Sequence, residues 1–324
     1  MSANLVSYLE RALLRRRILI ENSKTNFTTA YRLFGGGPEG IPGLVVERFA
    51  ELAILQFHAG ECRLSPGELE AVGQWYLKEL GLKAVYLKEF ISDRSQKTAA
   101  EALYSPIPLV GSECESVLEI REEGLAFEIR PYDGFSTGIF LDQRRHRSYL
   151  GRLARGKRVL NCFSYTCAFS VACAANDAEV DSVDLSKKYL EWGKRNFVLN
   201  GLDLAKHRFF ASDVFDFFKR AEKRAEKYDL VIVDPPSFSR NHLGQIFSVN
   251  RDLRKLMAGA VARVKPGGLL FFSSNYASWS SAHLARCAET VTSEHKKRRF
   301  EKLPEAPEDF QDDANPLSAI LLRL

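Results

Sequence analysis

Short apolar runs alternate with amphipathic stretches throughout the second half of the chain. Strand-helix alternation at this period predicts a doubly wound, mostly parallel sheet with helices on both faces, the Rossmann-like α/β class. Ligands of such sheets bind beyond the carboxyl ends of the strands, so the residues at those ends are the first candidates for a site. The predicted strands are residues 159–163, 179–183, 208–210, 230–233 and 269–273, and the predicted helices are residues 168–175, 187–199, 214–227 and 251–263.

The first half of the chain has a different pattern. Its opening ~20 residues predict a basic amphipathic helix with apolar positions at Leu5, Leu9, Leu13 and Ile18. We therefore expect two domains, a small α+β domain over residues 1–130 and a Rossmann-like domain over residues 131–324. The other elements predicted in the first domain are strands at residues 44–48, 53–57 and 85–88, a helix over residues 66–80, and a hairpin of residues 117–120 and 125–130.

Composition narrows the class of protein. The chain has 324 residues, 45% of them hydrophobic, which is enough for two cores. No apolar run reaches the ~18 residues that a membrane span needs. The six cysteines match no common zinc or disulfide spacing. We expect a cytoplasmic protein with reduced thiols, no metal site and no membrane segment.

The net charge of +5 is modest, but the basic residues are clustered. Residues 144–158 contain seven Lys or Arg and no acid, and two further clusters lie at residues 11–17 and 296–299. One such cluster is more typical of a solvated helix face than of a binding site. Three clusters in one chain favour a polyanionic partner, because they can pair with phosphates.

Polar residues follow each of the first three predicted strands. The first strand runs into Asn161-Cys162-Phe163-Ser164-Tyr165-Thr166-Cys167, a turn of small and turn-prone residues without the glycine fingerprint of NAD enzymes. Asp184 ends the second strand, where a carboxylate can accept the hydroxyls of an adenosine ribose. Asp213 follows the third strand, where it can accept a hydrogen bond from an adenine amino group. Both have an alternative interpretation as helix N-caps, for which Ser186 is the better candidate after Asp184.

The sharpest signal is Asp234-Pro235-Pro236-Ser237-Phe238 after an apolar strand. Two prolines fix the backbone beside the carboxylate. Rigid carbonyls and a carboxylate can orient an amine or ring nitrogen of a planar substrate, and Phe238 can stack on that base. The alternative is a turn that ends the strand, with Phe238 in the core.

These motifs resemble the RlmI- and RlmK-like methyltransferases of bacterial large-subunit ribosomal RNA. The likeness covers about residues 31–275. It is most specific at Thr137-Gly138-Ile139-Phe140-Leu141-Asp142-Gln143-Arg144 and at residues 161–169, whereas Asp-Pro-Pro-x-Phe is shared by many methyltransferases. Residues 34–48 also resemble the small domain that precedes the catalytic domain in RlmI-like members.

The resemblance implies S-adenosyl-L-methionine as cofactor and assigns roles to individual residues. Asp184 would bind the ribose, Leu185 the adenine face, and Asp213 with Val214 the adenine edge. Asp234 and Pro235, with Pro236 and Phe238, would face the methyl group and the substrate base. The turn residues Asn161, Phe163, Tyr165 and Thr166 would hold the cofactor, and Thr137, Phe140 and Gln143 would cover it.

Two departures from the family pattern matter. RlmI-like members carry an N-terminal PUA domain for RNA binding, for which this chain is too short. They also carry a cysteine after the last predicted strand, and its thiolate adds to the cytosine ring before C5 is methylated. Here Ser273-Ser274-Asn275 replaces it, which is closer to the guanine-N7 pattern of RlmK, and methylation at nitrogen needs no covalent adduct. Cys162 and Cys167 are interpreted as small packing residues.

The sequence leaves several functions open. The favoured one is methylation of a ring or exocyclic nitrogen of an RNA base, most plausibly in ribosomal RNA, by a monomer or homodimer. The alternatives are a methyltransferase for a small molecule or protein, a cytosine C5 enzyme with an unusual nucleophile, and a non-catalytic RNA-binding module. The three carboxylates at successive strand ends, Asp184, Asp213 and Asp234, argue against the last.

Overall fold

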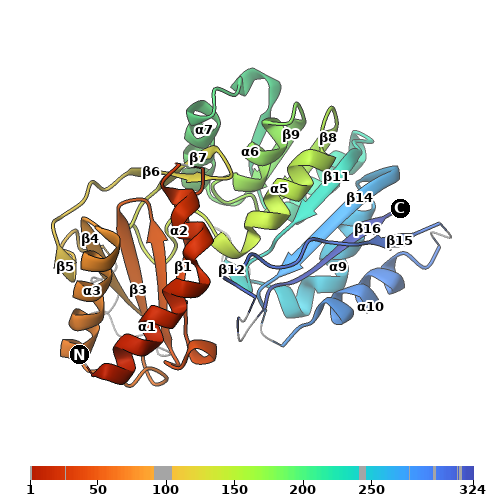
Figure 1. The fold of residues 1–324 in the computed structure, drawn as a ribbon. Coiled ribbons are helices and arrows are strands. Elements are labelled where there is room, and N and C mark those ends of the chain that lie inside the picture. Colours follow the sequence, from red (N-terminus) through yellow and green to blue (C-terminus); the bar gives the residue numbers. More distant parts are fainter. Residues whose placement is uncertain are drawn as a thin grey trace. The chain divides into compact units, whose positions relative to one another are not determined.

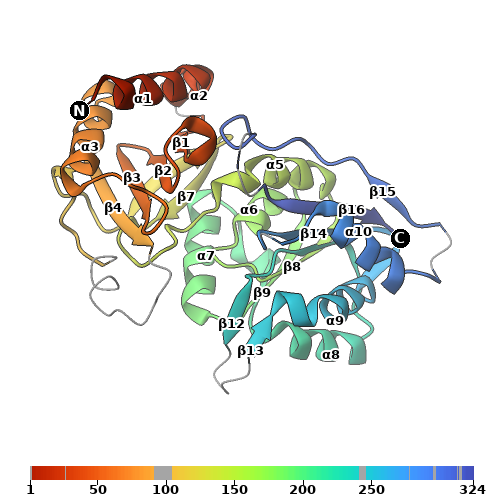
Figure 2. The same ribbon diagram turned by 90° about the horizontal axis from the view of Figure 1, so that it is seen from below.

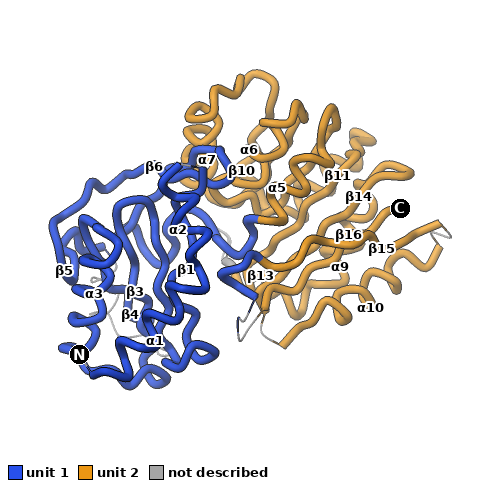
Figure 3. The backbone as a smooth tube through the Cα atoms, viewed as in Figure 1, with its two compact units in different colours: residues 1–144, 307–314 blue, residues 145–306, 315–324 orange. Residues whose placement is uncertain are grey.

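The chain forms two compact units. The computed structural model describes residues 2–25, 27–90, 104–240, 246–276, 278–294, 297–311, 313 and 316–324. Unit 1 contains residues 1–144 and 307–314, and unit 2 contains residues 145–306 and 315–324 (Figure 3). The division therefore falls after Arg144 rather than after residue 130, and the chain crosses between the units three times. Residues 307–314 are called the return segment below.

Unit 1 is built on a sheet with the strand order β1-β2-β3-β4-β5. Among the described strands of that sheet, the parallel pair is β3 with β4, which α3 connects. The helix α3 begins at a capping box of Ser65 and Glu68 and ends at Gly81 in the left-handed conformation, as the sequence predicts. The bounds are α1 Ala3–Arg15, α2 Arg17–Ser23, β1 Ala30–Gly35, η1 Gly37–Glu39, β2 Leu44–Phe49, β3 Leu52–His58, α3 Pro66–Leu80, β4 Ala84–Phe90, β5 Val110–Gly111, β6 Leu118–Glu122, β7 Leu125–Ile129 and η2 Leu141–Gln143.

The expected single N-terminal helix is wrong, because the helix breaks at Arg16. The Arg16 side chain is buried and forms an ion pair with Glu39. It also donates to the carbonyl oxygen of Arg32 at 3.0 Å. This anchoring interrupts the helical repeat, so that Leu19 is buried in α2 while Ile18 is 67% exposed.

The return segment supplies the carboxylates that pair with arginines of unit 1. Asp309 accepts from Arg144 Nη2 at 2.6 Å and from the backbone N–H of Arg32, in the edge strand β1, at 2.8 Å. The Arg32 side chain pairs with Asp313 at 2.6 Å and lies over the ring of Phe310, 3.9 Å from its centroid. The acidic stretch near the end of the sequence therefore has a structural role, which the sequence alone did not indicate.

Unit 2 contains a seven-stranded sheet with the order β10-β9-β8-β11-β14-β16-β15. The first five strands are parallel, whereas β16 and β15 are antiparallel to their neighbours. This confirms the predicted doubly wound, mostly parallel sheet (Figure 1). The bounds are α5 Arg144–Leu153, β8 Arg158–Cys162, α6 Ala168–Ala174, β9 Glu179–Asp184, α7 Lys187–Leu199, η3 Leu204–Lys206, β10 Arg208–Ala211, α8 Val214–Lys223, β11 Tyr228–Val233, β12 Phe238–Arg240, β13 Ile246–Ser248, α9 Val249–Val261, β14 Val264–Ser274, α10 Ser281–Val291, β15 Arg299–Glu301 and β16 Ser318–Arg323.

Helices cover both faces of this sheet, with α5, α6 and α7 on one face and α8, α9 and α10 on the other (Figure 2). Successive side chains of a strand point to opposite faces. Phe271 contacts His146 of α5 and Phe169 of α6, whereas Phe272 packs in the core formed with α8, α9 and α10. Both phenylalanines are fully buried, and each such side chain contributes about 1.5–3 kcal/mol to stability.

Candidate active site

The predicted site residues of unit 2 follow strands that end at one edge of the sheet. Cys162 of β8 lies opposite Val183 of β9 on one side and Val233 of β11 on the other. Asp184 and Asp234 directly follow those two partners. Because neighbouring strands are about 4.8 Å apart, the strands that lead to the two carboxylates are about 10 Å apart.

The turn after β8 has an unusual backbone. Phe163, Tyr165 and Cys167 all have positive φ angles, of 56°, 48° and 63°. This left-handed conformation costs free energy for residues other than glycine and persists only where the surroundings impose it. Here Ser164 donates its backbone N–H to the carbonyl oxygen of Val183 at 3.0 Å. The strained turn therefore presents backbone groups at the edge of the sheet, where a ligand can approach them.

Asp184 anchors that turn from the neighbouring strand. Its Oδ2 accepts the backbone N–H of Tyr165 at 2.8 Å, and its Oδ1 accepts that of Ser186 at 2.8 Å. Burial raises the pKa of Asp184, and these backbone hydrogen bonds oppose the shift. A carboxylate has about four acceptor positions, and the backbone N–H groups of Tyr165, Ser186 and Leu185 use three, so about one remains for a ligand. Ser186 caps α7 by accepting the N–H of Tyr189, as the sequence indicates.

Two of the expected cofactor residues are buried and form hydrogen bonds that support the turn. Asn161 is 1% exposed and donates from Nδ2 to Ser170 Oγ at 2.8 Å. Thr166 is fully buried, and its carbonyl oxygen accepts from Asn196 Nδ2 at 2.9 Å. Direct contact of either side chain with the cofactor stays a prediction. The supporting amide Asn196 was not singled out in the sequence, because nothing in its helix distinguishes it.

Asp213 acts as the N-cap of α8. Its Oδ1 accepts from the backbone N–H groups of Phe215 at 2.8 Å and Asp216 at 3.3 Å. The capping interpretation is therefore confirmed, and the contact of Asp213 with adenine stays a prediction. Val214 is buried and Leu185 is half-buried, and their predicted contacts with the cofactor are likewise not tested by the fold.

Asp234 is held by a hydroxyl of the adjacent strand. Ser273 of β14 is fully buried, and its Oγ donates to Asp234 Oδ1 at 2.7 Å. Ser273, the last residue of the predicted strand, thus fixes the Asp234 carboxylate. The sequence shows a pair of serines there, but it does not show that one reaches Asp234.

The chain leaves the sheet after Asp234 with Phe238 exposed. Pro235 is buried, Pro236 is exposed, and Phe238 is 56% exposed. The alternative in which Phe238 packs in the core is therefore wrong. Ser237 Oγ donates to Asn275 Oδ1 at 3.2 Å, which connects this segment to the end of β14.

The cysteines near the site are poor nucleophiles. Cys162, Cys167 and Cys173 are buried, and burial raises the pKa of each thiol, to about 12 for Cys167 and Cys173. A thiol with so high a pKa is neutral at physiological pH, and only the thiolate attacks. These residues pack in the interior, as expected for Cys162 and Cys167.

The expected covering residues lie in unit 1. Thr137 and Gln143 are buried, and Phe140 is 48% exposed. Gly134 precedes these residues in the chain, and its carbonyl oxygen accepts a hydrogen bond from the buried ammonium of Lys88 at 2.7 Å. Burial lowers the pKa of Lys88 to about 8. That these residues cover a cofactor stays a prediction.

Both interpretations of the basic clusters, a solvated helix face and a phosphate-binding surface, are wrong for several of their members. Arg144 and Arg147 are each 3% exposed, and Arg16 is 6% exposed. Arg16 and Arg144 are instead buried in ion pairs with carboxylates of unit 1. Lys296, at the start of the third cluster, lies outside the described residues.

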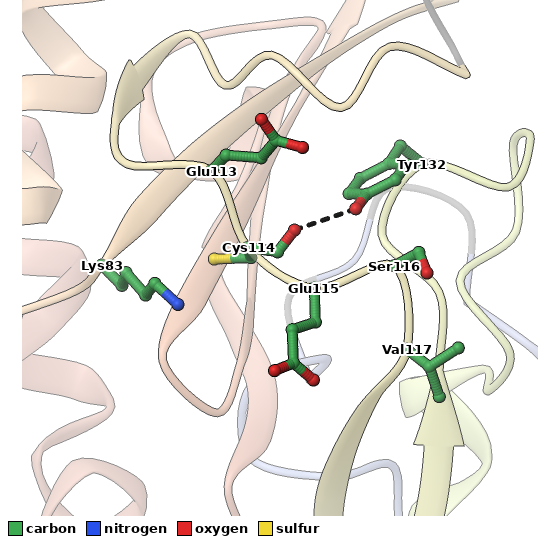
Figure 4. A pocket seen from close by; sticks show the side chains of 7 residues that line it. All are labelled: Lys83, Glu113, Cys114, Glu115, Ser116, Val117 and Tyr132. Carbon is green, nitrogen blue, oxygen red and sulfur yellow. Dashed lines mark hydrogen bonds between the residues drawn. The ribbon is translucent and has the colours of Figure 1, made fainter.

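A pocket lies in unit 1, and none of its lining residues is a predicted site residue. It has a volume of about 630 Å³ and is open to solvent. Tyr132 donates its hydroxyl to the carbonyl oxygen of Cys114 at 2.9 Å at its wall (Figure 4). The lining contains two carboxylates, Glu113 and Glu115, and one cation, Lys83, so its charge does not favour phosphate.

Two searches of the described part of the chain are negative. No group of three or more His, Cys, Asp or Glu residues there is arranged to hold a metal ion. None of the described helices combines the length and apolar character needed to cross a bilayer.

Comparisons with known proteins converge on one activity. A family model described as S-adenosylmethionine-dependent methyltransferase matches residues 101–323. The ribosomal RNA large subunit methyltransferase K of Neisseria meningitidis is 38% identical over 195 residues, which are 60% of this chain and 53% of that protein. The ribosomal RNA large subunit methyltransferase I of Yersinia pseudotuberculosis is 35% identical over 247 residues, 74% of this chain and 59% of that protein. The chain thus spans between half and three fifths of these relatives.

A solved structure matches the whole chain. It is a crystal structure of a methyltransferase complexed with SAH, with a TM-score of 0.85 and 29% sequence identity. The match covers 100% of this chain and 83% of that one.

Proposed function

We propose that this chain, which belongs to the family of S-adenosylmethionine-dependent methyltransferases, methylates a nitrogen of an RNA base, in large-subunit ribosomal RNA. The observation that carries the proposal is the Asp234 carboxylate, held by buried Ser273, beside an exposed Phe238 at the edge of the sheet where ligands bind. A fixed acceptor next to an exposed aromatic ring suits a flat base with an N–H group.

The turn after β8 and Asp184 fit the cofactor of this family. Asp184 has about one acceptor position left after anchoring the turn, which suits a ribose hydroxyl. The strained backbone at Phe163 and Tyr165 lets backbone groups approach a ligand closely. When bound, S-adenosyl-L-methionine supplies an electrophilic methyl group on a positively charged sulfur. Asp213 and Leu185 would complete the adenosine site.

Asp234 orients the substrate in this proposal. The hydroxyl of Ser273 fixes the orientation of the Asp234 carboxylate, which suits that carboxylate to accept a hydrogen bond from an amine or ring N–H of the base. Phe238 stacks on the base and excludes water from one of its faces. Transfer to a nitrogen lone pair mainly requires positioning, which these fixed groups supply. Cytosine C5 chemistry is not favoured, because Ser273-Ser274-Asn275 contains no cysteine and the cysteines near the site carry raised pKa values.

The relatives support RNA as the substrate. Both curated relatives are named as methyltransferases of large-subunit ribosomal RNA and are 35–38% identical. We place the activity in the cytoplasm, where ribosomal RNA is found in bacteria, and propose that the protein works as a monomer or homodimer.

The test is a methylation assay with tritiated cofactor on ribosomal RNA from a strain that lacks the gene, followed by mass spectrometry of the nucleosides. We expect a methylated base, and we expect Asp234→Ala to lower kcat at least 100-fold while the cofactor Kd changes less than threefold. Asp234→Asn, which retains one oxygen acceptor, should lose less activity. Normal turnover by Asp234→Ala would refute its role, and methyl transfer to proteins but not to RNA would refute the substrate.

A further inference from the structure

The outer face of α9 carries a group of cations beside the exposed Phe238. Arg251, Arg254 and Lys255 are exposed and spaced three and four residues apart, so they lie on one side of the helix. Asp252 is the acid between them, and it is already engaged by Arg251 at 2.7 Å and by the backbone N–H of Ser248 at 3.1 Å. The buried residues of α9 face the core and the three cations are exposed, with the ammonium of Lys255 4.5 Å from the ring centroid of Phe215 in α8.

This face is connected directly to the proposed base-binding segment. The first residue of α9, Val249, donates its backbone N–H to the carbonyl oxygen of Ser237 at 3.2 Å. In the hairpin, Phe238 pairs with Ser248, which immediately precedes the helix. Figure 2 shows β12 and β13 leading into α9. With a rise of 1.5 Å per residue, the Cα atom of Arg251 lies within about 5 Å, along the helix axis, of Ser248, the residue that pairs with Phe238.

We propose that this α9 face, defined as Arg251, Arg254 and Lys255, binds the phosphates that flank the nucleotide to be methylated. The inference rests on the proposed function and names where the RNA backbone is held. A base that leaves its stack to reach Phe238 carries its own phosphates with it, and these must be neutralised close to the stacking ring. Arginine and lysine are the side chains that bind phosphate, and their contacts fix position without reading sequence.

A second group of cations in unit 2 serves as the control. Lys223, Arg224 and Lys227 are also exposed, but they lie at the end of α8, directly before β11 begins. They are therefore at the amino edge of the sheet, opposite the candidate active site. Replacing three cations by glutamine in either group changes the net charge equally.

The experiment measures RNA methylation by wild type, by Arg251→Gln/Arg254→Gln/Lys255→Gln and by the α8 control triple variant, over a range of salt concentrations. Each phosphate contact contributes about 0.7 to the slope of log affinity against log salt for a single strand. We expect the α9 triple variant to raise KM for RNA at least tenfold and to lower this slope by about 1.5–2. Its kcat at saturating RNA and its cofactor Kd should stay within about threefold of wild type. The control variant should change the slope by less than 0.5.

The outcomes separate this inference from the function on which it rests. If wild type binds cofactor but transfers no methyl group to RNA, the proposed function fails and this inference with it. If wild type methylates RNA and the two triple variants behave alike, only the α9 face is refuted. If the α9 triple variant loses its cofactor affinity, Arg254→Gln alone is compared with Arg224→Gln, with an expected slope change of about 0.7 against none.

Discussion

The ion pair of Arg144 with Asp309 determines how firmly the return segment is attached to unit 1. The two side chains are 3% and 0% exposed, and Nη2 and Oδ1 are 2.6 Å apart. Asp309 also accepts the backbone N–H of Arg32. Asp309→Ala would leave a buried guanidinium and an edge-strand N–H without this acceptor. Breaking a buried pair in this way costs about 3–5 kcal/mol, so we expect a loss of that size in the free energy that holds the segment.

Hydrogen exchange of the Phe310 amide, which donates to the carbonyl oxygen of Pro307 within the return segment and keeps that acceptor in every variant, measures this free energy. A loss of about 3 kcal/mol corresponds to exchange more than 100-fold faster. Asp313→Ala is the matched control, because its pair with Arg32 is a quarter exposed and should be worth about 1 kcal/mol or less. In a double-mutant cycle, Arg144→Ala and Asp309→Ala together should cost less than the two single changes added. Additive costs, or exchange less than tenfold faster in Asp309→Ala, would refute the reasoning.

Three further predictions concern unit 2. Asp184→Asn places an amide donor against a backbone N–H and should raise the cofactor Kd at least tenfold by calorimetry; unchanged affinity would contradict the assigned role. Gly193→Ala brings a Cβ into the side chain of Cys167 and should lower the free energy of unfolding in urea by about 1–3 kcal/mol, whereas Gly67→Ala, which meets no atom within 4 Å, should not. Burial, with the nearby Arg147 charge second, lowers the pKa of His146 to about 4, so the unfolded chain binds this proton first as pH falls. Stability should therefore be complete above about pH 6.5 and decline toward pH 4, by on the order of 3 kcal/mol, and His146→Phe should remove that part of the decline; an identical pH profile for the variant would count against it.

The strands of unit 2 were predictable because each one is an apolar run that a turn ends. The predicted parallel strands agree with β8, β9, β10 and β11 within about two residues, and β14 begins earlier than predicted. The helix caps Asp213 and Ser186 were also predictable, because capping depends only on neighbouring residues. Helix α5 was missed because its many basic residues were interpreted as a charged cluster. The antiparallel strand β16 was missed because its place depends on a distant partner, β14.

Charge is where sequence reasoning went furthest from the structure. Counting cations identifies clusters but not their partners, and Arg144 finds its partner 165 positions away. The pattern therefore could not separate buried from exposed arginines. The same holds for the left-handed residues Phe163, Tyr165 and Cys167, whose local preferences oppose the conformation that the fold imposes.

The sequence indicated the positions of the carboxylates of the candidate site, but not which residues hold them. Asp184 and Asp234 follow strands of the same sheet edge, which follows from the parallel order of the strands. That Ser273 fixes Asp234 and that Asn161 faces Ser170 depends on packing between strands and helices, which no local pattern records.

The route of the chain through the return segment has a consequence for biosynthesis. Residues 307–314 and strand β16 are made after everything with which they pair. Until they leave the ribosome, Arg144 and Arg32 lack the carboxylates of the segment, and β14 has an open edge that can pair with other chains. A nascent chain that stops before residue 307 is thus defective in both halves at once.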